Sequence, residues 1–132
     1  MRKVIKIPSR IENLRKVEKV IDEISSDFHI GEDLYGNILI AALEATNNAI
    51  MHGNGLNEEK DVTISFNLEN KILNVKVDDE GNGFDFENIP DPTAPENLEN
   101  VNGRGIFLME KLSDNIKFSR NGATVELEFN MK

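Results

Sequence analysis

Glu44 and Asn48 are the first residues whose types and spacing suggest chemistry. They lie four positions apart in the stretch 41–53, and in a helix this spacing puts both side chains on one face, one turn apart. On a mostly buried helix, a carboxylate and a carboxamide carry a desolvation cost unless something binds them. A hydrated magnesium ion and a water molecule would suit the pair, because magnesium takes hard oxygen ligands and a carboxylate can accept a proton from a hydroxyl. The alternative is a solvated polar stripe on a surface helix.

Asp79 is a second candidate, because it ends a segment in which positions 73, 75 and 77 are apolar. By the period of two in a strand, the aspartate shares the apolar face that helices should cover. A buried acid needs a hydrogen-bond donor, and the exocyclic amine of adenine would serve. The alternative is that the strand has ended and the carboxylate is solvated.

Two glycine clusters follow these acidic residues. Gly81 and Gly83 come directly after Asp79 and allow another group to approach the backbone closely. Gly103-Arg104-Gly105 opens a predicted helix at 105–112, and the amides at a helix N-terminus are suited to phosphates. The clusters are neither a Walker A loop, which ends in Gly-Lys-Ser/Thr, nor part of a parallel βαβ unit of the Rossmann type.

Periodicity and capping signals predict the elements that position these residues. Residues 2–7 form a strand, and Ser9 with Glu12 makes a capping-box pattern that predicts a helix. The apolar face of that helix comprises Ile11, Leu14, Val17, Ile21 and Ile24. A second helix runs from about residue 32 to 52 and ends at the glycines 53 and 55.

The second half of the chain alternates in the manner of strands. Runs at 62–68 and 73–77 predict an antiparallel hairpin with a turn near 69–71, and 116–118 and 125–129 flank the hairpin turn Asn121-Gly122. Residues 80–104 lack periodicity, which is typical of a lid or a binding loop, and 105–112 form a short helix. The expected fold is a two-layer α+β sandwich, with a mostly antiparallel sheet and helices on one face.

Composition narrows the class of protein. With 132 residues, the chain is long enough for one domain with one core, and we expect a single domain over residues 1–132. The formal charge of −9 argues against nucleic acid or an anionic membrane as partner. There is no cysteine, which excludes disulfides and thiolate metal sites, and no stretch resembles a signal peptide or a membrane span. We therefore expect a cytoplasmic protein.

The order of the motifs is more specific than any one of them. Glu44-x-x-x-Asn48-Ala-x-x-His52-Gly53, Asp79-x-Gly81-x-Gly83-Phe84, an aperiodic stretch and Gly103-Arg-Gly105-Ile-Phe-Leu-Met follow one another. This arrangement resembles the histidine-kinase-like ATPase superfamily, which has the Bergerat fold. More narrowly, it is similar to the anti-sigma-factor serine/threonine kinases of bacterial partner-switching systems.

The resemblance implies a role for each matching residue. Glu44 would be the general base and Asn48 the ligand of Mg²⁺, while Asp79 would bind the adenine amino group of ATP. The glycines 81 and 83 would shape the base pocket, and Gly103, Arg104 and Gly105 would cradle the phosphates through backbone amides beneath the lid. Two positions depart from the pattern: many relatives carry Thr at position 123, where this chain has Ala, and Arg104 stands where a small or aliphatic residue is frequent.

Three functions are open at this point. The first is an ATP-dependent protein kinase that phosphorylates an antagonist protein and sequesters a sigma factor; the resemblance also implies a homodimer. The second is a nucleotide-gated binding module that switches partners without phosphorylating them. The third is a detached catalytic domain of a sensor histidine kinase, which usually follows a dimerising helix pair for which this chain has no room. Glu44 favours the kinase over the binder, because a pure binder needs Asn48 but no base.

Overall fold

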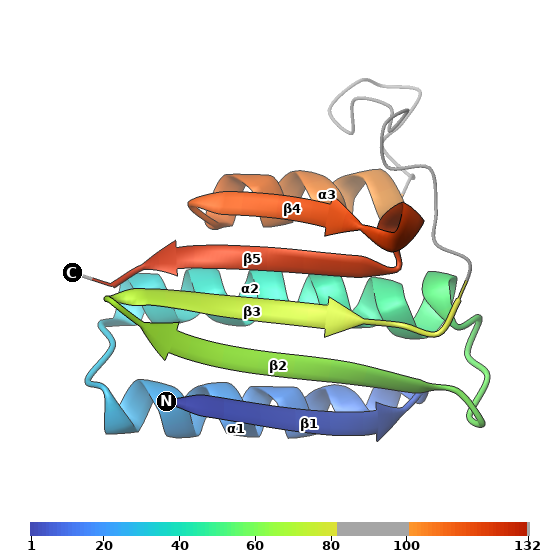
Figure 1. Ribbon diagram of the computed structural model, residues 1–132, viewed down its shortest axis with the longest axis horizontal. Coiled ribbons are helices and arrows are strands. Elements are labelled where there is room, and N and C mark those ends of the chain that lie inside the picture. The colour runs from blue at the N-terminus through green and yellow to red at the C-terminus, as the bar shows by residue number, and fades with distance from the viewer. Residues whose placement is uncertain (82–100, 132) are drawn as a thin grey trace.

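The computed structural model describes residues 1–81 and 101–131, and for residues 101–104 it describes the backbone only. Five strands form one antiparallel sheet in the order β1-β2-β3-β5-β4 (Figure 1). They are β1 (Arg2–Pro8), β2 (Asp61–Glu69), β3 (Ile72–Asp78), β4 (Asn115–Ser119) and β5 (Thr124–Asn130). The strands adjacent in sequence within the second half pair as predicted, β2 with β3 and β4 with β5.

Three helices cover one face of this sheet (Figure 1). They are α1 (Leu14–Asp27), which follows a 3₁₀ turn at Ile11–Asn13, α2 (Glu32–Asn48) and α3 (Val101–Leu112). A π-helical turn, Ala49–Gly53, continues α2. The predicted two-layer α+β sandwich is confirmed. In the described part of the chain, no helix is long and apolar enough to cross a membrane.

The two faces of the sheet differ as the alternation of the strands requires. The face toward the helices forms the core, and its buried residues include Val62, Ile64, Phe66, Leu73, Val75, Val77, Leu127 and Phe129. On the opposite face, Lys76 pairs with Glu126, and Glu126 pairs with Lys117 on the edge strand. Opposite charges directly across a ladder favour this pairing of the strands.

Four local predictions need correction. The Ser9 hydroxyl does not cap a helix; it donates to the Lys60 carbonyl at 2.7 Å, and Ile11 on the predicted apolar face is exposed. The predicted extent of the second helix, about 32 to 52, is confirmed, but the part after Asn48 is a π-helical turn that ends at Gly53. α3 begins at Val101, not at Gly105, so the second glycine cluster lies inside the helix.

The connection between β4 and β5 is the fourth correction. It is a 3₁₀ turn, Arg120–Gly122, and not a two-residue Asn-Gly turn. Arg120 and Asn121 both have positive φ, and the strands rejoin where Ser119 pairs with Thr124. The extra residues let the Arg120 guanidinium donate to the Asp79 carbonyl at 3.3 Å. Most of the predicted lid, 82–100, lies outside the described residues.

The β2–β3 turn yields a stability prediction, because Asn70 and Lys71 both have positive φ, at 52° and 62°. A residue with a side chain loses about 1–2 kcal/mol of stability when its backbone is left-handed, and glycine avoids this cost. Glycine has a smaller cost of its own, about 0.4–1 kcal/mol, because the unfolded chain gains conformational freedom. Lys71→Gly should therefore raise the free energy of unfolding in urea titrations. Lys117→Gly, at an exposed position inside β4, should lower it. A loss of stability in Lys71→Gly would contradict the assigned turn.

Candidate functional site

Glu44 and Asn48 share the side of α2 that faces α3. A Cβ atom at position 105 would lie 3.0 Å from Glu44 Oε2 and 3.0 Å from Asn48 Nδ2. Any larger residue at 105 would push against the ends of the two polar side chains, so glycine there allows the close approach of α3. The sequence therefore placed Glu44 and Asn48 correctly on one face, and the structure brings Gly105 against both.

Asn48 is buried, with 8% of its surface exposed, and its Oδ1 has no hydrogen-bond partner among the described residues. A buried acceptor without a donor costs about 1–3 kcal/mol. A hard cation removes that cost by binding the oxygen directly, so Asn48 fits a magnesium ligand. The described residues contain no cluster of three His, Cys, Asp or Glu side chains that could hold a metal alone. A magnesium ion here would need oxygen ligands from water or from a bound substrate.

Asp79 directly follows β3 and is buried, with 5% of its surface exposed. Its carboxylate Oδ1 accepts from the Gly81 amide at 2.8 Å, and its own amide donates to the Ala123 carbonyl at 2.9 Å. Among the described residues, nothing donates to the other carboxylate oxygen. Burial raises the pKa of the Asp79 carboxyl above its ordinary value of 3.8, and the Gly81 amide opposes this increase. The alternative of a solvated acid is therefore wrong.

Two glycines make room for this carboxylate. A Cβ atom at position 53 would lie 2.1 Å from Asp79 Oδ2, and one at position 81 would lie 1.9 Å from the Gly53 carbonyl oxygen. Gly81 was predicted to shape a pocket, whereas Gly53 was predicted only to end a helix. Its contact with a residue 26 positions later has no local signal in the sequence.

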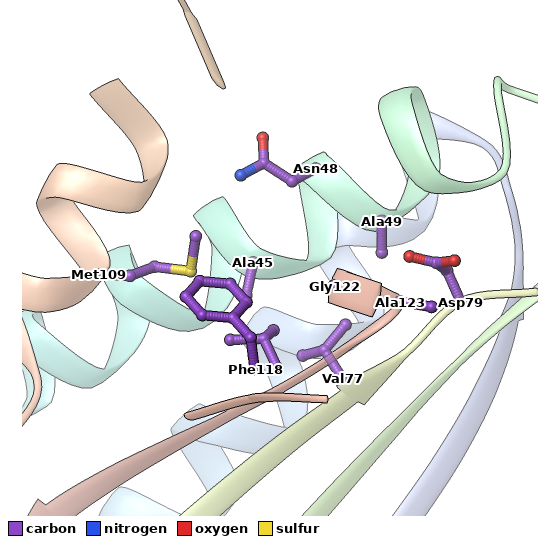
Figure 2. Close-up of a pocket in the computed structure, with 10 residues that line it drawn as sticks. Ala45, Asn48, Ala49, Val77, Asp79, Met109, Phe118, Gly122 and Ala123 are labelled. Atoms are coloured by element: carbon purple, nitrogen blue, oxygen red, sulfur yellow. The ribbon is translucent and has the colours of Figure 1, made fainter. Parts of the chain in front are cut away.

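A pocket lies between α2, the end of α3 and the strands β3, β4 and β5, and both Asn48 and Asp79 line it. In Figure 2, Asp79 lies at one end and Met109 and Phe118 at the other, with Asn48 projecting from α2 above them. The lining residues are Ala45, Asn48, Ala49, Val77, Asp79, Met109, Phe118, Gly122, Ala123 and Val125. Apolar walls with one acid at the end suit a flat, aromatic group that carries a hydrogen-bond donor.

The remaining predicted residues are placed only in part. Gly103 and Arg104 belong to the first turn of α3, whose amides lack partners within the helix. The Arg104 side chain and all of Gly83 lie outside the described residues. Gly105 lies in the second turn, where an amide bonds within the helix, so its contribution is the close approach to α2. Sequence reasoning used Phe118 with Ile116 only to mark a strand and did not assign it to the pocket.

Comparison with known proteins gives consistent results. The family model for the histidine kinase-like ATPase domain matches residues 7–129. The serine-protein kinase RsbW of Oceanobacillus iheyensis is 26% identical over 121 residues, which is 87% of this chain and 77% of that protein. RsbW of Bacillus subtilis is 27% identical over 130 residues, covering 93% of this chain and 81% of that protein.

Solved structures share the fold. The RsbU and RsbW domains of Rv1364c from Mycobacterium tuberculosis match with a TM-score of 0.70 at 17% identity, over 99% of this chain and 32% of that one. The histidine kinase domain of the blue-light activated kinase EL346 from Erythrobacter litoralis matches with a TM-score of 0.56 at 21% identity. That match covers 95% of this chain and 62% of the other.

Gly53 yields a prediction about nucleotide binding. In Gly53→Ala, the new methyl group overlaps the Asp79 carboxylate and must displace it, so ATP affinity measured by calorimetry should fall at least about tenfold. Gly36→Ala is the matched control, because a Cβ atom there meets nothing within 4 Å. That variant should bind ATP normally and gain about 1 kcal/mol of stability from the better helix former. Equal ATP affinity in both variants would remove Asp79 from the binding site.

Asp79 yields a prediction about pH. Because its pKa is raised in the folded state, the folded protein binds the proton more tightly than the unfolded chain does, and ionisation of Asp79 lowers stability. Asp79→Asn should therefore stabilise the nucleotide-free protein at neutral pH, and this gain should shrink as the pH is lowered through the raised pKa. Urea titrations at several pH values measure it. A gain that does not depend on pH would contradict the buried, ionised acid.

Proposed function

The chain belongs to the histidine kinase-like ATPase domain family, and on this premise we propose that it is an ATP-dependent serine/threonine protein kinase of the anti-sigma-factor type. Its substrate would be an antagonist protein in a partner-switching system, and a sigma factor and a second copy of the chain would be further partners. The observation that carries the proposal is the position of Glu44, beside Asn48 and against α3. The names of the RsbW relatives support the kinase class.

Asp79 would bind the adenine of ATP. Its ionised carboxylate has one oxygen available to accept from the exocyclic amine, and the opposite walls of the pocket are apolar. The small side chains of Ala45, Ala49 and Ala123 leave room for the ring. With Ala at 123 in place of a hydroxyl, recognition of the base depends more heavily on Asp79.

Asn48 would hold magnesium through its unpartnered Oδ1. When bound, the ion supplies charge neutralisation for the triphosphate, which a chain with a formal charge of −9 otherwise repels. The first turn of α3, with the amides of Gly103 and Arg104, would receive the phosphates, because free amides and the helix dipole favour anions.

Glu44 would be the general base. It lies one turn before Asn48 on α2, at the α3 end of the site and away from Asp79. A carboxylate here repels the triphosphate and weakens ground-state binding. Its benefit comes only when it accepts the proton of the attacking serine or threonine hydroxyl, an interaction made in the transition state.

The test compares two substitutions on adjacent turns of one helix. Glu44→Gln should keep or strengthen ATP binding, while transfer of phosphate to the antagonist protein falls about 10²–10⁴-fold, the usual contribution of a general base. Asn48→Ala should lose both binding and transfer, because the magnesium ligand is removed. Labelled ATP with candidate antagonist proteins measures transfer, and calorimetry measures binding.

Glu110→Gln is the control, because it makes the same change at an exposed position of α3. It should leave ATP binding and phosphate transfer unchanged. Transfer at the wild-type rate in Glu44→Gln would exclude Glu44 as the base. A wild-type protein that binds an antagonist only with ATP, yet transfers no phosphate, would favour the nucleotide-gated binding module.

A further inference from the structure

Asn54 occupies a buried position directly after the π-helical turn, with 4% of its surface exposed. Its side-chain amide donates from Nδ2 to Ser9 Oγ at 2.8 Å and to the Asp61 carbonyl at 3.0 Å. Its Oδ1 accepts from the Glu80 amide at 2.8 Å. One side chain thus joins the end of β1, the start of β2 and the segment that follows β3.

The Glu80 amide is the important partner, because it lies between Asp79 and Gly81. Gly81 packs against the Gly53 carbonyl, the residue directly before Asn54, and the Asp79 carboxylate lies against Gly53. Segments 53–54 and 79–81 are therefore joined at two points, by backbone packing and by the Asn54–Glu80 hydrogen bond. The Glu80 carboxylate also accepts from the Asp61 amide, so this segment is held from two sides.

We propose that Asn54 is a positioning residue for adenine recognition, which fixes the backbone at Glu80 and thereby aims the Asp79 carboxylate into the pocket. The proposal rests on the proposed function, in which Asp79 binds the base. Without the Asn54 acceptor, the Glu80 amide is left unpaired, and segment 79–81 loses one of the contacts that fix its position relative to Gly53. A shift of this kind misaligns a short, directional hydrogen bond while the phosphate end of the site keeps its geometry.

Ser9 separates this role from general stability. Its hydroxyl belongs to the same network, accepting from Asn54 and donating to the Lys60 carbonyl, and none of its hydrogen bonds in the described part of the chain involves Glu80. Ser9→Ala also leaves Asn54 its bond to the Asp61 carbonyl and its bond from Glu80. Ser9→Ala therefore weakens the network but keeps the hydrogen bond from the Glu80 amide to Asn54, which is the contact that the proposal requires.

The experiment measures the affinities for Mg-ATP and Mg-GTP in the wild type, Asn54→Ala and Ser9→Ala. GTP has a carbonyl oxygen at position 6 of the base, where ATP has the amine that would donate to Asp79, so the ratio of the two affinities reports the base contact separately from the phosphate contacts. In Asn54→Ala the ATP/GTP ratio should fall about tenfold, equivalent to the loss of one buried hydrogen bond of about 1.4 kcal/mol. In Ser9→Ala the ratio should stay at the wild-type value even though the protein unfolds at lower urea.

The outcomes separate the two proposals. A wild-type ratio in a folded Asn54→Ala variant overturns the positioning role alone, and so does an equal fall of the ratio in Ser9→Ala. A wild type that binds neither nucleotide, or binds both equally, overturns the adenine assignment and this inference with it. If Asn54→Ala does not fold, Asn54→Ser replaces it, because a hydroxyl is too short to join Ser9 and Glu80 together, and the same fall of the ratio is expected.

Discussion

The close packing of α2 on the centre of the sheet is the constraint on which the rest of the structure depends. Four of the buried residues along α2 and the π-helical turn are small: Ala41, Ala42, Ala45 and Ala49. Small residues bring the helix backbone near the sheet, and interiors are too densely packed to leave that distance undetermined. Where the alanines meet Ala123 and Val77, the remaining space is the pocket. The same packing turns the edge with Glu44 and Asn48 toward α3, so the fold itself sets the orientation of the polar pair.

The change from α- to π-helix after Asn48 explains how one helix serves two ends of the site. The Asn54 amide bonds to the Ala49 carbonyl, and the Leu56 amide to the Ile50 carbonyl, so the wider turn keeps its hydrogen bonds. A widened turn rotates the residues that follow, which is why such turns recur at functional sites. Here it carries Gly53 against Asp79 and directs the Asn54 side chain into the interior.

The sequence predicted the parts of this structure that depend on local periodicity. Alternation located the strands and placed Asp79 on the core-facing side, and the four-residue spacing placed Glu44 with Asn48. The errors arose where distant contacts outweigh local preference. Ser9 has the pattern of a helix cap, but its hydroxyl donates to the Lys60 carbonyl and accepts from the Asn54 side-chain amide. Gly103 and Gly105 suggested a helix start, but burial of Ile106 and Met109 offsets the glycine penalty of about 1 kcal/mol each. No local pattern marks the π-helical turn or the contact of Gly53 with Asp79.

Two buried polar groups in the described site lower the stability of the protein. The chemistry of these groups defines which ligand would remove that cost. The Asp79 carboxylate is buried, which penalises its charged form, and among the described residues the buried Asn48 Oδ1 has no hydrogen-bond partner. Both groups are acceptors, and they lie at different parts of one pocket lined otherwise by apolar side chains (Figure 2). A ligand that satisfies both must bring a donor to one and a cation or donor to the other, with an apolar surface between them. A nucleotide whose phosphates arrive with a metal ion meets these requirements. The acidic character of the chain points the same way, because a net charge of −9 repels a polyanion that has no bound cation. The unpaired Asn48 oxygen and the overall charge therefore both favour a nucleotide that arrives with a cation, as the proposed function requires.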